Sequence, residues 1–322
     1  MILLAEKDIY DVIIIGGGAA GMTAAIYTAR KLMKTLVISV DIGGQNLLTE
    51  HEENYPGYTA LSGPKLMQIF YEQALNFGAD FVMGMASKVD KIKEDHLKVT
   101  ISSGETYESK TLILSFGKIP KKLGIPGEDK FIGRGVHTCA TCDSTLMKNR
   151  TVAVVGGGNS ALEAAELLSK FATKVYLIHR RDSFKGDEIT QENLKKAKNI
   201  EFVLNSAPME VLGDEKVKGL LVEDVNSKDK REIKLDSIFV EIGYEVKTDF
   251  VRHLVHLNEK NEIVTNELAE TSHKGIFAAG DITNKPYKQT VTAAGEGAAA
   301  GLSAYNYMLR KEGKEGVRAD WG

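Results

Sequence analysis

The sequence has little cysteine, no long apolar run and no strong excess of charge of either sign. No run of about 18 consecutive apolar residues occurs, so we expect no transmembrane helix. The formal net charge is −3, which gives no general attraction to nucleic acid or to an anionic membrane. The apolar start of the chain is too short for the core of a signal peptide, and the next apolar run leads directly into a glycine loop. We therefore expect a cytoplasmic protein, in which the two cysteines do not form a purely structural disulfide.

A chain of 322 residues is long for a single core, and an internal repeat indicates two domains. The stretch DVIIIGGGAAGMTAAIYTARKLMKTLVISV begins at Asp11, and TVAVVGGGNSALEAAELLSKFATKVYLIHR begins at Thr151. Each predicts a strand, a glycine loop, an amphipathic helix and a second strand, which together form a βαβ unit of a parallel sheet. We expect these strands at residues 12–15, 36–39, 152–155 and 175–178.

The segments that follow each repeat have a different pattern. Residues 81–117 and 202–243 alternate apolar and polar side chains, which predicts an antiparallel β-layer in each half. The second layer returns to a buried strand at residues 237–242. Residues 275–282 predict one more buried strand, and residues 290–309 predict a helix rich in small residues.

The first glycine loop, GGGAAG at residues 16–21, follows a strand and opens a helix. In that setting the pattern G-x-G-x-x-G predicts a dinucleotide site, because its glycines let the backbone approach a pyrophosphate at the helix N-terminus. No carboxylate ends the next strand, where Ser39 and Val40 stand, and Asp41 is the nearest acidic residue.

The second glycine loop, GGGNSA at residues 156–161, fits the same pattern with alanine in the last position. An NAD site would place Asp or Glu about 20 residues further on, to hold the ribose 2′-hydroxyl. This sequence has His179, Arg180 and Arg181 there, with Lys185 close by. Cations at this position favour the 2′-phosphate of NADP, and the alternative is a solvated basic turn.

Both cysteines lie in HTCATCD, at Cys139 and Cys142. A zinc site needs about four ligands and no other cysteine exists, although His137 and distant histidines are available. Two inert buried thiols are a second alternative, which the neighbouring Asp143 disfavours. The C-x-x-C pattern favours a dithiol/disulfide pair that exchanges two electrons. Asp143 is then an acid–base partner, or a cap for the turn after the cysteines.

With these residues in view, the chain resembles the low-molecular-weight thioredoxin reductases of bacteria and archaea, which are FAD-dependent pyridine nucleotide-disulfide oxidoreductases. The resemblance covers nearly the full length. Besides the two glycine loops, its markers are GGQ, NYPGY, CATCD, HRRDSF, GIFAAGDI and YKQTVTAAGEG, in that family's order. It implies an α/β fold of two Rossmann-like three-layer (ββα) nucleotide-binding domains, the second inserted into the first. The FAD-binding domain would comprise residues 1–119 and 247–322, and the NADPH-binding domain with the C-x-x-C pair would comprise residues 120–246.

The resemblance also implies which residues form each site, and we expect no metal. For FAD these are Gly16, Gly18, Ala19, Ala20, Gly21, Asp41, Gly44, Gln45, Asn54, Gly117, Gly280, Asp281, Lys288, Gln289 and Thr290. For NADPH they are Gly156, Gly158, Asn159, Ser160, Ala161, His179, Arg180, Arg181 and Lys185. The catalytic residues would be Cys139, Cys142 and Asp143.

The activity implied is that of a homodimeric thioredoxin reductase, which passes electrons from NADPH through FAD and the cysteine pair to thioredoxin or a thioredoxin-like protein. One alternative is a reductase of another acceptor, such as a glutaredoxin-like or peroxidase-linked protein. A slow FAD-binding redox sensor is another, and a ferredoxin–NADP reductase is disfavoured by the C-x-x-C pair. Because the cysteines and the NADPH loop must both reach one flavin, we expect the inserted domain to rotate about residues 118–123 and 243–248.

Overall fold

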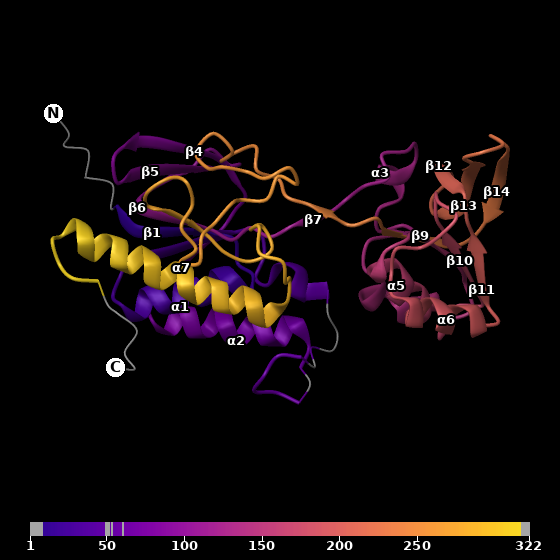
Figure 1. Ribbon diagram of the computed structural model, residues 1–322, viewed down its shortest axis with the longest axis horizontal. Coiled ribbons are helices and arrows are strands. Elements are labelled where there is room, and N and C mark those ends of the chain that lie inside the picture. Colours follow the sequence, from indigo (N-terminus) through magenta and orange to yellow (C-terminus); the bar gives the residue numbers. More distant parts are fainter. Residues whose placement is uncertain (1–8, 49–51, 53, 60, 317–322) are drawn as a thin grey trace. The chain divides into compact units, whose positions relative to one another are not determined.

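The computed structural model describes residues 9–48, 52, 54–59 and 61–316, apart from the side chains of Leu48, Thr141 and Cys142. By its internal contacts the chain divides into two compact units, coloured along the sequence in Figure 1. Unit 1 comprises Met1–Lys118 and Val246–Gly322, and unit 2 comprises Ile119–Glu245.

Unit 1 is built on one mixed sheet. Its strands are β1 (Tyr10–Ile15), β2 (Thr35–Ser39), β3 (Asp80–Met83), β4 (Ala86–Lys93), β5 (His96–Ile101), β6 (Thr106–Leu114) and β17 (Ile276–Ala278). Its helices are α1 (Ala19–Arg30), the 3₁₀ helix η1 (Gly44–Leu48), α2 (Gly63–Asn76) and α7 (Thr290–Lys311). The sheet order is β3-β2-β1-β6-β5-β4, and β17 also pairs with β6.

The long strand β6 joins the parallel part of this sheet to the antiparallel part. Along residues 109–114 it pairs in parallel with β1. On its other edge, residues 106–109 pair antiparallel with β5, and residues 112–114 pair in parallel with β17. One strand therefore ties the first glycine loop, the antiparallel layer and the C-terminal segment into one structure.

Both faces of β1 are buried, as its continuous apolar run predicts. Val12 and Ile14 face a core shared with α1, α2 and α7, whereas Ile13 and Ile15 face a core under β4, β5 and the segment after Val246. Figure 1 shows α7 and α1 running side by side over the first face, with α2 beside them. Unit 1 thus has three layers: helices, the main sheet and a β-layer.

Unit 2 repeats this plan with smaller parts. Its strands are β7 (Ile119–Pro120), β8 (Val136–His137), β9 (Thr151–Gly156), β10 (Lys174–Ile178), β11 (Ile200–Val203), β12 (Ser206–Gly213), β13 (Val217–Asp224), β14 (Lys230–Lys234), β15 (Ser237–Glu241) and β16 (Tyr244–Glu245). Its helices are α3 (Glu128–Phe131), α4 (Ala140–Asp143), the 3₁₀ helix η2 (Ser144–Met147), α5 (Asn159–Ser169) and α6 (Glu188–Lys196).

The main sheet of unit 2 is parallel, in the order β11-β10-β9-β15-β8. On β9, Val152 and Val154 pack toward α5, while Ala153 and Val155 pack toward β12, β13 and β14, which form a separate three-stranded sheet. The predicted α/β fold of two Rossmann-like three-layer units is confirmed.

Two strands differ from the sequence prediction. Residues 81–83 and 202–203 were expected in the antiparallel layers, but β3 pairs in parallel with β2, and β11 pairs in parallel with β10. Each of these strands follows a helix and is short, so alternation alone cannot distinguish which neighbour it will pair with. The antiparallel layers begin one strand later, at β4 and β12.

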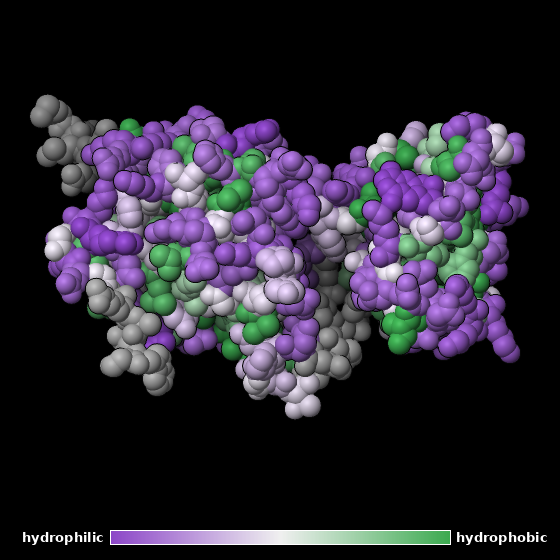
Figure 2. Space-filling view, viewed as in Figure 1, coloured by the Kyte–Doolittle hydropathy of each residue, from purple (hydrophilic) through white to green (hydrophobic). Residues whose placement is uncertain are grey.

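The segments that enter and leave unit 2 run as a two-stranded ribbon. β7 pairs antiparallel with β16, and the Lys121 N–H donates to the Gly243 carbonyl oxygen at 2.9 Å. Polar residues cover most of the visible face of each unit, with apolar residues scattered among them (Figure 2). Within the described residues, no helix is both long and apolar enough to cross a bilayer.

Candidate active site

The first glycine loop connects β1 to α1, and neighbouring backbone crowds it. Gly16 has a φ of +113°, and a Cβ on it would lie 2.3 Å from the Ser115 carbonyl oxygen. A Cβ on Gly21 would lie 1.8 Å from the Gly16 carbonyl oxygen. The Gly17 N–H donates to Ser39 Oγ at 2.8 Å. Side chains are therefore excluded at positions 16 and 21 by the fold of unit 1 itself.

The space in front of α1 is suited to an anion. Gly18 is the N-cap, and no side chain among the described residues caps the first N–H groups of the helix. A Cβ on Gly18 would have its nearest neighbour at 3.6 Å, the Gly43 carbonyl oxygen, so its glycine leaves room that the chain does not fill. Free N–H groups at the positive end of a helix dipole favour a phosphate group. The loop residues Ala19 and Ala20 are buried behind it.

Residues expected at the flavin from both ends of unit 1 meet at the start of α7. Asn54 Nδ2 donates to Gln289 Oε1 at 3.0 Å. Thr290 Oγ1 donates to Asn46 Oδ1 at 2.6 Å, which brings η1 to the N-terminus of the same helix. The three predicted residues Asn54, Gln289 and Thr290 therefore lie in one region, together with Asn46, which the sequence analysis missed.

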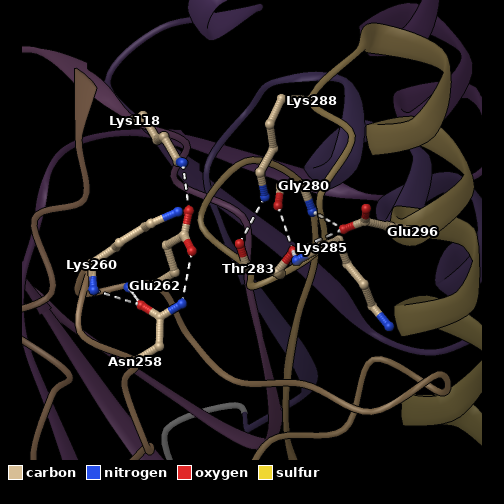
Figure 3. A network of polar contacts seen from close by, with 9 residues as sticks. All are labelled: Lys118, Asn258, Lys260, Glu262, Gly280, Thr283, Lys285, Lys288 and Glu296. Atoms are coloured by element: carbon tan, nitrogen blue, oxygen red, sulfur yellow. Dashed lines mark hydrogen bonds and ion pairs between the residues drawn. The ribbon is translucent and has the colours of Figure 1, made fainter. Parts of the chain in front are cut away.

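Lys118, the last residue of unit 1 before the chain enters unit 2, is held by two sets of contacts. Its Nζ lies 2.8 Å from Glu262 Oε1, and Asn258 Nδ2 donates to Glu262 Oε2 at 2.8 Å (Figure 3). Its carbonyl oxygen accepts a hydrogen bond from Gln45 Nε2 at 3.2 Å. The ion pair is largely buried, with side-chain exposures of 19% for Lys118 and 12% for Glu262.

A second set of contacts in Figure 3 fixes the turn that carries Asp281. Glu296, within α7, accepts hydrogen bonds from the Gly280 N–H at 2.8 Å and from Thr283 Oγ1 at 3.2 Å. Lys288 Nζ donates to the Thr283 carbonyl oxygen at 2.7 Å. Glu296 thus ties the turn that carries Gly280 and Asp281 to α7, and Lys288 bonds to the same turn from the segment before α7.

Burial shifts the ionisation of these groups. It raises the pKa of Asp281, and the positive charges of Lys288 and Lys118 partly oppose that rise. It also raises the pKa of Glu296, against its hydrogen bonds from Gly280 and Thr283. Burial and the nearby Lys118 lower the pKa of Lys288. Unit 1 therefore carries a balanced set of half-buried carboxyls and ammonium groups beside α7.

Two further residues expected at the FAD site shape the backbone. Asp41 Oδ1 accepts the Gly44 N–H at 2.7 Å, so this carboxylate closes its own turn. Gly117 has a φ of +69° and directly precedes Lys118. Asp41 lies just after the carboxyl end of β2, and Gly117 lies just after that of β6. Both segments contact the first glycine loop.

The second glycine loop connects β9 to α5 and is more open than the first. A Cβ on Gly156 would lie 2.2 Å from the Glu241 carbonyl oxygen, but a Cβ on Gly158 would have nothing within 4 Å. Gly158, Asn159 and Ser160 are exposed, and Gly158 caps α5 without a side-chain hydrogen bond among the described residues. Asn159 Oδ1 accepts the Asp187 N–H at 2.8 Å. The helix N-terminus again presents free N–H groups.

The predicted basic cluster lies beside this loop. The ring of His179 packs against Gly157 and stacks on Phe184, with ring centroids 5.4 Å apart. Burial, followed by the charges of Arg181 and Arg180, lowers the pKa of His179. Its Nε2 is buried with no hydrogen-bond partner among the described residues.

The other cations of the cluster are exposed. Arg180, Arg181 and Lys185 all have exposed side chains, and within the described residues neither guanidinium is in an ion pair. The Lys185 N–H donates to the Gly157 carbonyl oxygen at 2.7 Å, which fixes the cluster to the glycine loop. Unpaired guanidinium groups next to a helix N-terminus suit a ligand with a second phosphate.

The cysteine segment lies in unit 2, between β8 and β9. Cys139 is disulfide-bonded and partly buried, and it directly precedes α4. The side chain of Cys142 lies outside the described residues. No group of three or more His, Cys, Asp or Glu side chains among the described residues is arranged to hold a metal ion.

Asp143 ends α4, and its side chain does not cap the next turn. It occupies the N-cap position of η2 without a side-chain capping hydrogen bond. The alternative that it serves as a helix cap is therefore wrong. Its Oδ2 lies 2.6 Å from Nδ1 of His137 instead, because that ring comes within reach from β8.

A half-buried carboxyl lies next to the same helix. Burial raises the pKa of Glu241, at the end of β15, to about 7, and the negative charge of Glu163 adds to the rise. A hydrogen bond with the backbone of Ala140, between the two cysteines, opposes it. Sequence analysis missed Glu241, along with Asn46, Glu262 and Glu296, because single polar residues in apolar or mixed stretches give no local signal.

Comparisons with known proteins match a range of the chain that includes both glycine loops and the cysteine segment. A model of the pyridine nucleotide-disulphide oxidoreductase family matches residues 10–297. The chain is 39% identical over 311 residues to a thioredoxin reductase of Mycolicibacterium smegmatis, covering 95% of this chain and 99% of that protein. It is 40% identical over 317 residues to one component of the alkyl hydroperoxide reductase of Pseudomonas aeruginosa, covering 97% of this chain and 61% of that protein.

A solved structure agrees with these similarities. The crystal structure of Lactococcus lactis thioredoxin reductase in its FR conformation matches with a TM-score of 0.83 and 37% sequence identity. The match covers 94% of this chain and 99% of that one.

Proposed function

This chain belongs to the pyridine nucleotide-disulphide oxidoreductase family, and from that membership we propose that it is an NADPH-dependent thioredoxin reductase. It would pass electrons from NADPH through FAD and the Cys139–Cys142 pair to the disulfide of thioredoxin. The observation that carries the proposal is the disulfide-bonded Cys139 in the same unit as a glycine loop flanked by exposed arginines, which form no ion pair with the described residues. When bound, FAD and NADPH supply a two-electron transfer, which matches the two electrons that reduce one disulfide.

FAD is assigned to unit 1. Its pyrophosphate would lie at the N-terminus of α1, before Gly16, Gly18 and Gly21. Gln45, Asn54, Gln289 and Thr290 would surround the flavin, since hydrogen bonds already bring them to one region. The FAD-binding domain would then consist of both chain ends, with its boundaries near Lys118 and Val246.

NADPH is assigned to unit 2. Its pyrophosphate would lie at the N-terminus of α5, where Gly158, Asn159 and Ser160 are exposed. Arg180 and Arg181 would bind the 2′-phosphate with charge-assisted hydrogen bonds, which select NADPH over NADH. His179 would shape the loop from behind, since its ring lies against Gly157.

The cysteine pair would carry the electrons to the acceptor by thiol–disulfide exchange. A thiolate of the reduced pair attacks one sulfur of the acceptor disulfide, and the leaving sulfur takes a proton. Asp143 would take part in that proton transfer. Because the pair and the NADPH loop lie in one unit, alternating rotation about residues 118–123 and 243–248 would bring each in turn to the flavin.

A separate thioredoxin is the acceptor that the similarities favour. A peroxidase-linked acceptor is the second candidate, because the chain also resembles a component of an alkyl hydroperoxide reductase over 61% of that component's length. A cytoplasmic homodimer completes the proposal. Gel filtration with light scattering would test the dimer, and a monomer would contradict it.

The test is NADPH oxidation by the purified FAD-loaded protein with thioredoxin as the acceptor. Turnover should depend on thioredoxin and should fall to background in Cys139→Ser and in Cys142→Ser, while both variants keep their FAD. A glutaredoxin-like and a peroxidase-linked protein are compared in the same assay. Turnover with one of these but none with thioredoxin would replace the proposed acceptor.

A further inference from the structure

The acid beside the redox cysteines has a partner that the family resemblance does not supply. His137 and Asp143 are six positions apart and lie on either side of the C-x-x-C segment. Nδ1 of His137 and Oδ2 of Asp143 are 2.6 Å apart, a short distance for a hydrogen bond between these groups. The contact between these two side chains therefore joins the two ends of the cysteine segment.

The position of His137 is fixed by the sheet. It is the last residue of β8, which pairs in parallel with β15 so that His137 lies opposite Phe239. Its ring stacks on the Phe239 ring, with centroids 4.9 Å apart and an interplanar angle of 17°. The His137 side chain is only 13% exposed, and that of Asp143 is 30% exposed. A ring with one face on a fully buried phenylalanine cannot swing away without losing that contact.

Chemistry gives the pair a role that a lone carboxylate would fill poorly. Carboxyls ordinarily lose their proton near pH 4, whereas imidazole is the side chain that takes up a proton near neutral pH. With one added proton, the pair is an imidazolium facing a carboxylate. Moving the Nδ1 proton onto Asp143 makes the carboxylic acid that a leaving thiolate needs, and it leaves a neutral imidazole.

We propose that His137 is a positioning residue that orients Asp143 and shares with it the proton used in thiol–disulfide exchange. The proposal rests on the reductase function proposed above. It explains why Asp143 does not cap η2, since its carboxylate is committed to the ring of His137.

The proton count closes over one exchange. A cysteine thiolate attacks the acceptor disulfide: an enzyme–acceptor S–S bond forms, the acceptor S–S bond breaks, and the leaving thiolate takes the proton of the His137–Asp143 pair. The second cysteine thiol then gives its proton to the pair and attacks the mixed disulfide. The Cys139–Cys142 disulfide forms, the second acceptor thiolate leaves and takes a proton from water, and the pair again holds its proton.

Among the described residues, the elements packed around the cysteine segment carry acidic side chains. They are Glu241 on β15, and Glu163 and Glu166 on α5, which packs on α4. Glu241 follows Phe239 by two residues and so points to the same face of the sheet. η2 and β9, which flank the segment, have no ionisable side chain.

The test uses two replacements of His137 in the full FAD-loaded chain. Asn places an amide N–H where Nδ1 donates, but it cannot carry the proton. Phe keeps the stacking on Phe239 but provides neither the hydrogen-bond donor nor a site for the proton. We expect kcat for thioredoxin reduction at pH 7 to fall about tenfold to a hundredfold in both. The wild-type kcat should fall as pH rises through the range where imidazole loses its proton, and His137→Asn should lose that limb of the profile.

A matched control comes from another His–carboxylate pair, which lies in unit 1. His96 Nε2 lies 2.6 Å from Glu108 Oε2 in unit 1, away from the cysteines in the sequence and on different strands. His96→Asn should leave both kcat and its pH profile unchanged. The double variant His137→Asn with Asp143→Asn should lose no more activity than Asp143→Asn alone, because the two residues act as one unit.

Several results would overturn the inference. They are an unchanged kcat and pH profile in the His137 variants, additive losses in the double variant, or an equal loss of NADPH-driven flavin reduction, which would mean general damage. If wild-type protein reduces flavin with NADPH but never reduces thioredoxin, it is the proposed function that fails. The pair is then tested in the same way with whichever disulfide acceptor supports turnover.

Discussion

The two glycine loops have the same local fold but different surroundings, and the contrast concerns how firmly each could hold its nucleotide. In unit 1, Ala19, Ala20 and Gly21 are buried under α7 at the start of α1. In unit 2, the corresponding start of α5 is exposed from Gly158 to Ser160. The first loop is therefore held by packing within unit 1, whereas the second is open to solvent. This difference suits a bound FAD and an NADPH that exchanges in each turnover.

The largest expected effect separates the loops by one substitution in each. Gly21→Ala places a Cβ 1.8 Å from the Gly16 carbonyl oxygen, so the loop must open and FAD content should fall to near zero. Gly158→Ala meets no atom of the chain within 4 Å. We expect it to leave FAD content and stability unchanged and to raise the KM for NADPH about tenfold, because the new methyl group occupies ligand space. Flavin absorbance and NADPH kinetics measure both. Equal FAD loss in the two variants would remove the contrast.

The exposed cations of unit 2 allow a test of which nucleotide the second glycine loop selects. Replacing Arg180 and Arg181 together by Gln removes two charge-assisted contacts, each of which ordinarily stabilises by about 1.5–3 kcal/mol. The KM for NADPH should rise at least about a hundredfold, and that for NADH should hardly change. Arg231→Gln, an exposed change on β14 of the same unit, is the control. An unchanged preference between the two nucleotides would contradict the assignment of this cluster to the 2′-phosphate.

The half-buried carboxyls of the two units also differ. Asp281 and Glu296 have lysines near them, whereas Glu241 has the carboxylate of Glu163. The pKa of Glu241 is raised from 4.5 to about 7, mainly by burial. Its favourable contribution to stability is therefore complete below about pH 4.5 and is lost as pH rises through 7.

Glu241→Gln keeps an acceptor oxygen and removes this ionisation. The oxidised wild-type protein should lose up to about 3 kcal/mol between pH 5 and pH 8 from this group, and the variant should not. Melting temperatures from pH 5 to pH 8 measure the difference, with the exposed change Glu210→Gln as control. Parallel pH curves for wild type and Glu241→Gln would show that this carboxyl ionises in the same way in the folded and unfolded chain.

The smallest effect concerns the helix that encloses the first loop. A Cβ on Gly297 would lie 2.1 Å from the Ala20 carbonyl oxygen, whereas one on Gly295 would meet nothing within 4 Å. Both lie inside α7, where Ala is intrinsically about 1 kcal/mol better than Gly. Gly297→Ala should destabilise unit 1 by about 2 kcal/mol through overpacking. Gly295→Ala should be neutral or stabilising by less than about 1 kcal/mol. Denaturant unfolding followed by flavin fluorescence compares the two variants, and equal midpoints would show that α7 does not press on α1.

The parts of the fold with a strong local sequence pattern were predictable. The continuous apolar runs before each glycine loop gave β1 and β9, and the small-residue helix near the C-terminus is α7. The partners of β3 and β11 were not predictable, because a four-residue strand has the same alternation in a parallel and an antiparallel pair.

The candidate site likewise has a part that the sequence predicts and a part that it does not. The glycines, the cations after β10 and the C-x-x-C pair each have a local signature. The contacts that hold them do not. The bond between Glu296 and the Gly280 N–H joins residues from a helix and a turn, and the His137–Asp143 pair depends on the pairing of β8 with β15. Such contacts follow from tertiary packing, which one sequence does not reveal.

The most direct test of the electron path is an anaerobic titration of the FAD-loaded protein with NADPH, followed by flavin absorbance. If the Cys139–Cys142 disulfide is in the path, full reduction should consume about two equivalents of NADPH per FAD, since flavin and disulfide each take two electrons. Cys142→Ser should consume about one. If the wild-type protein also stops at one equivalent and its thiols stay oxidised, the cysteine pair is not in the electron path and the reductase function is contradicted.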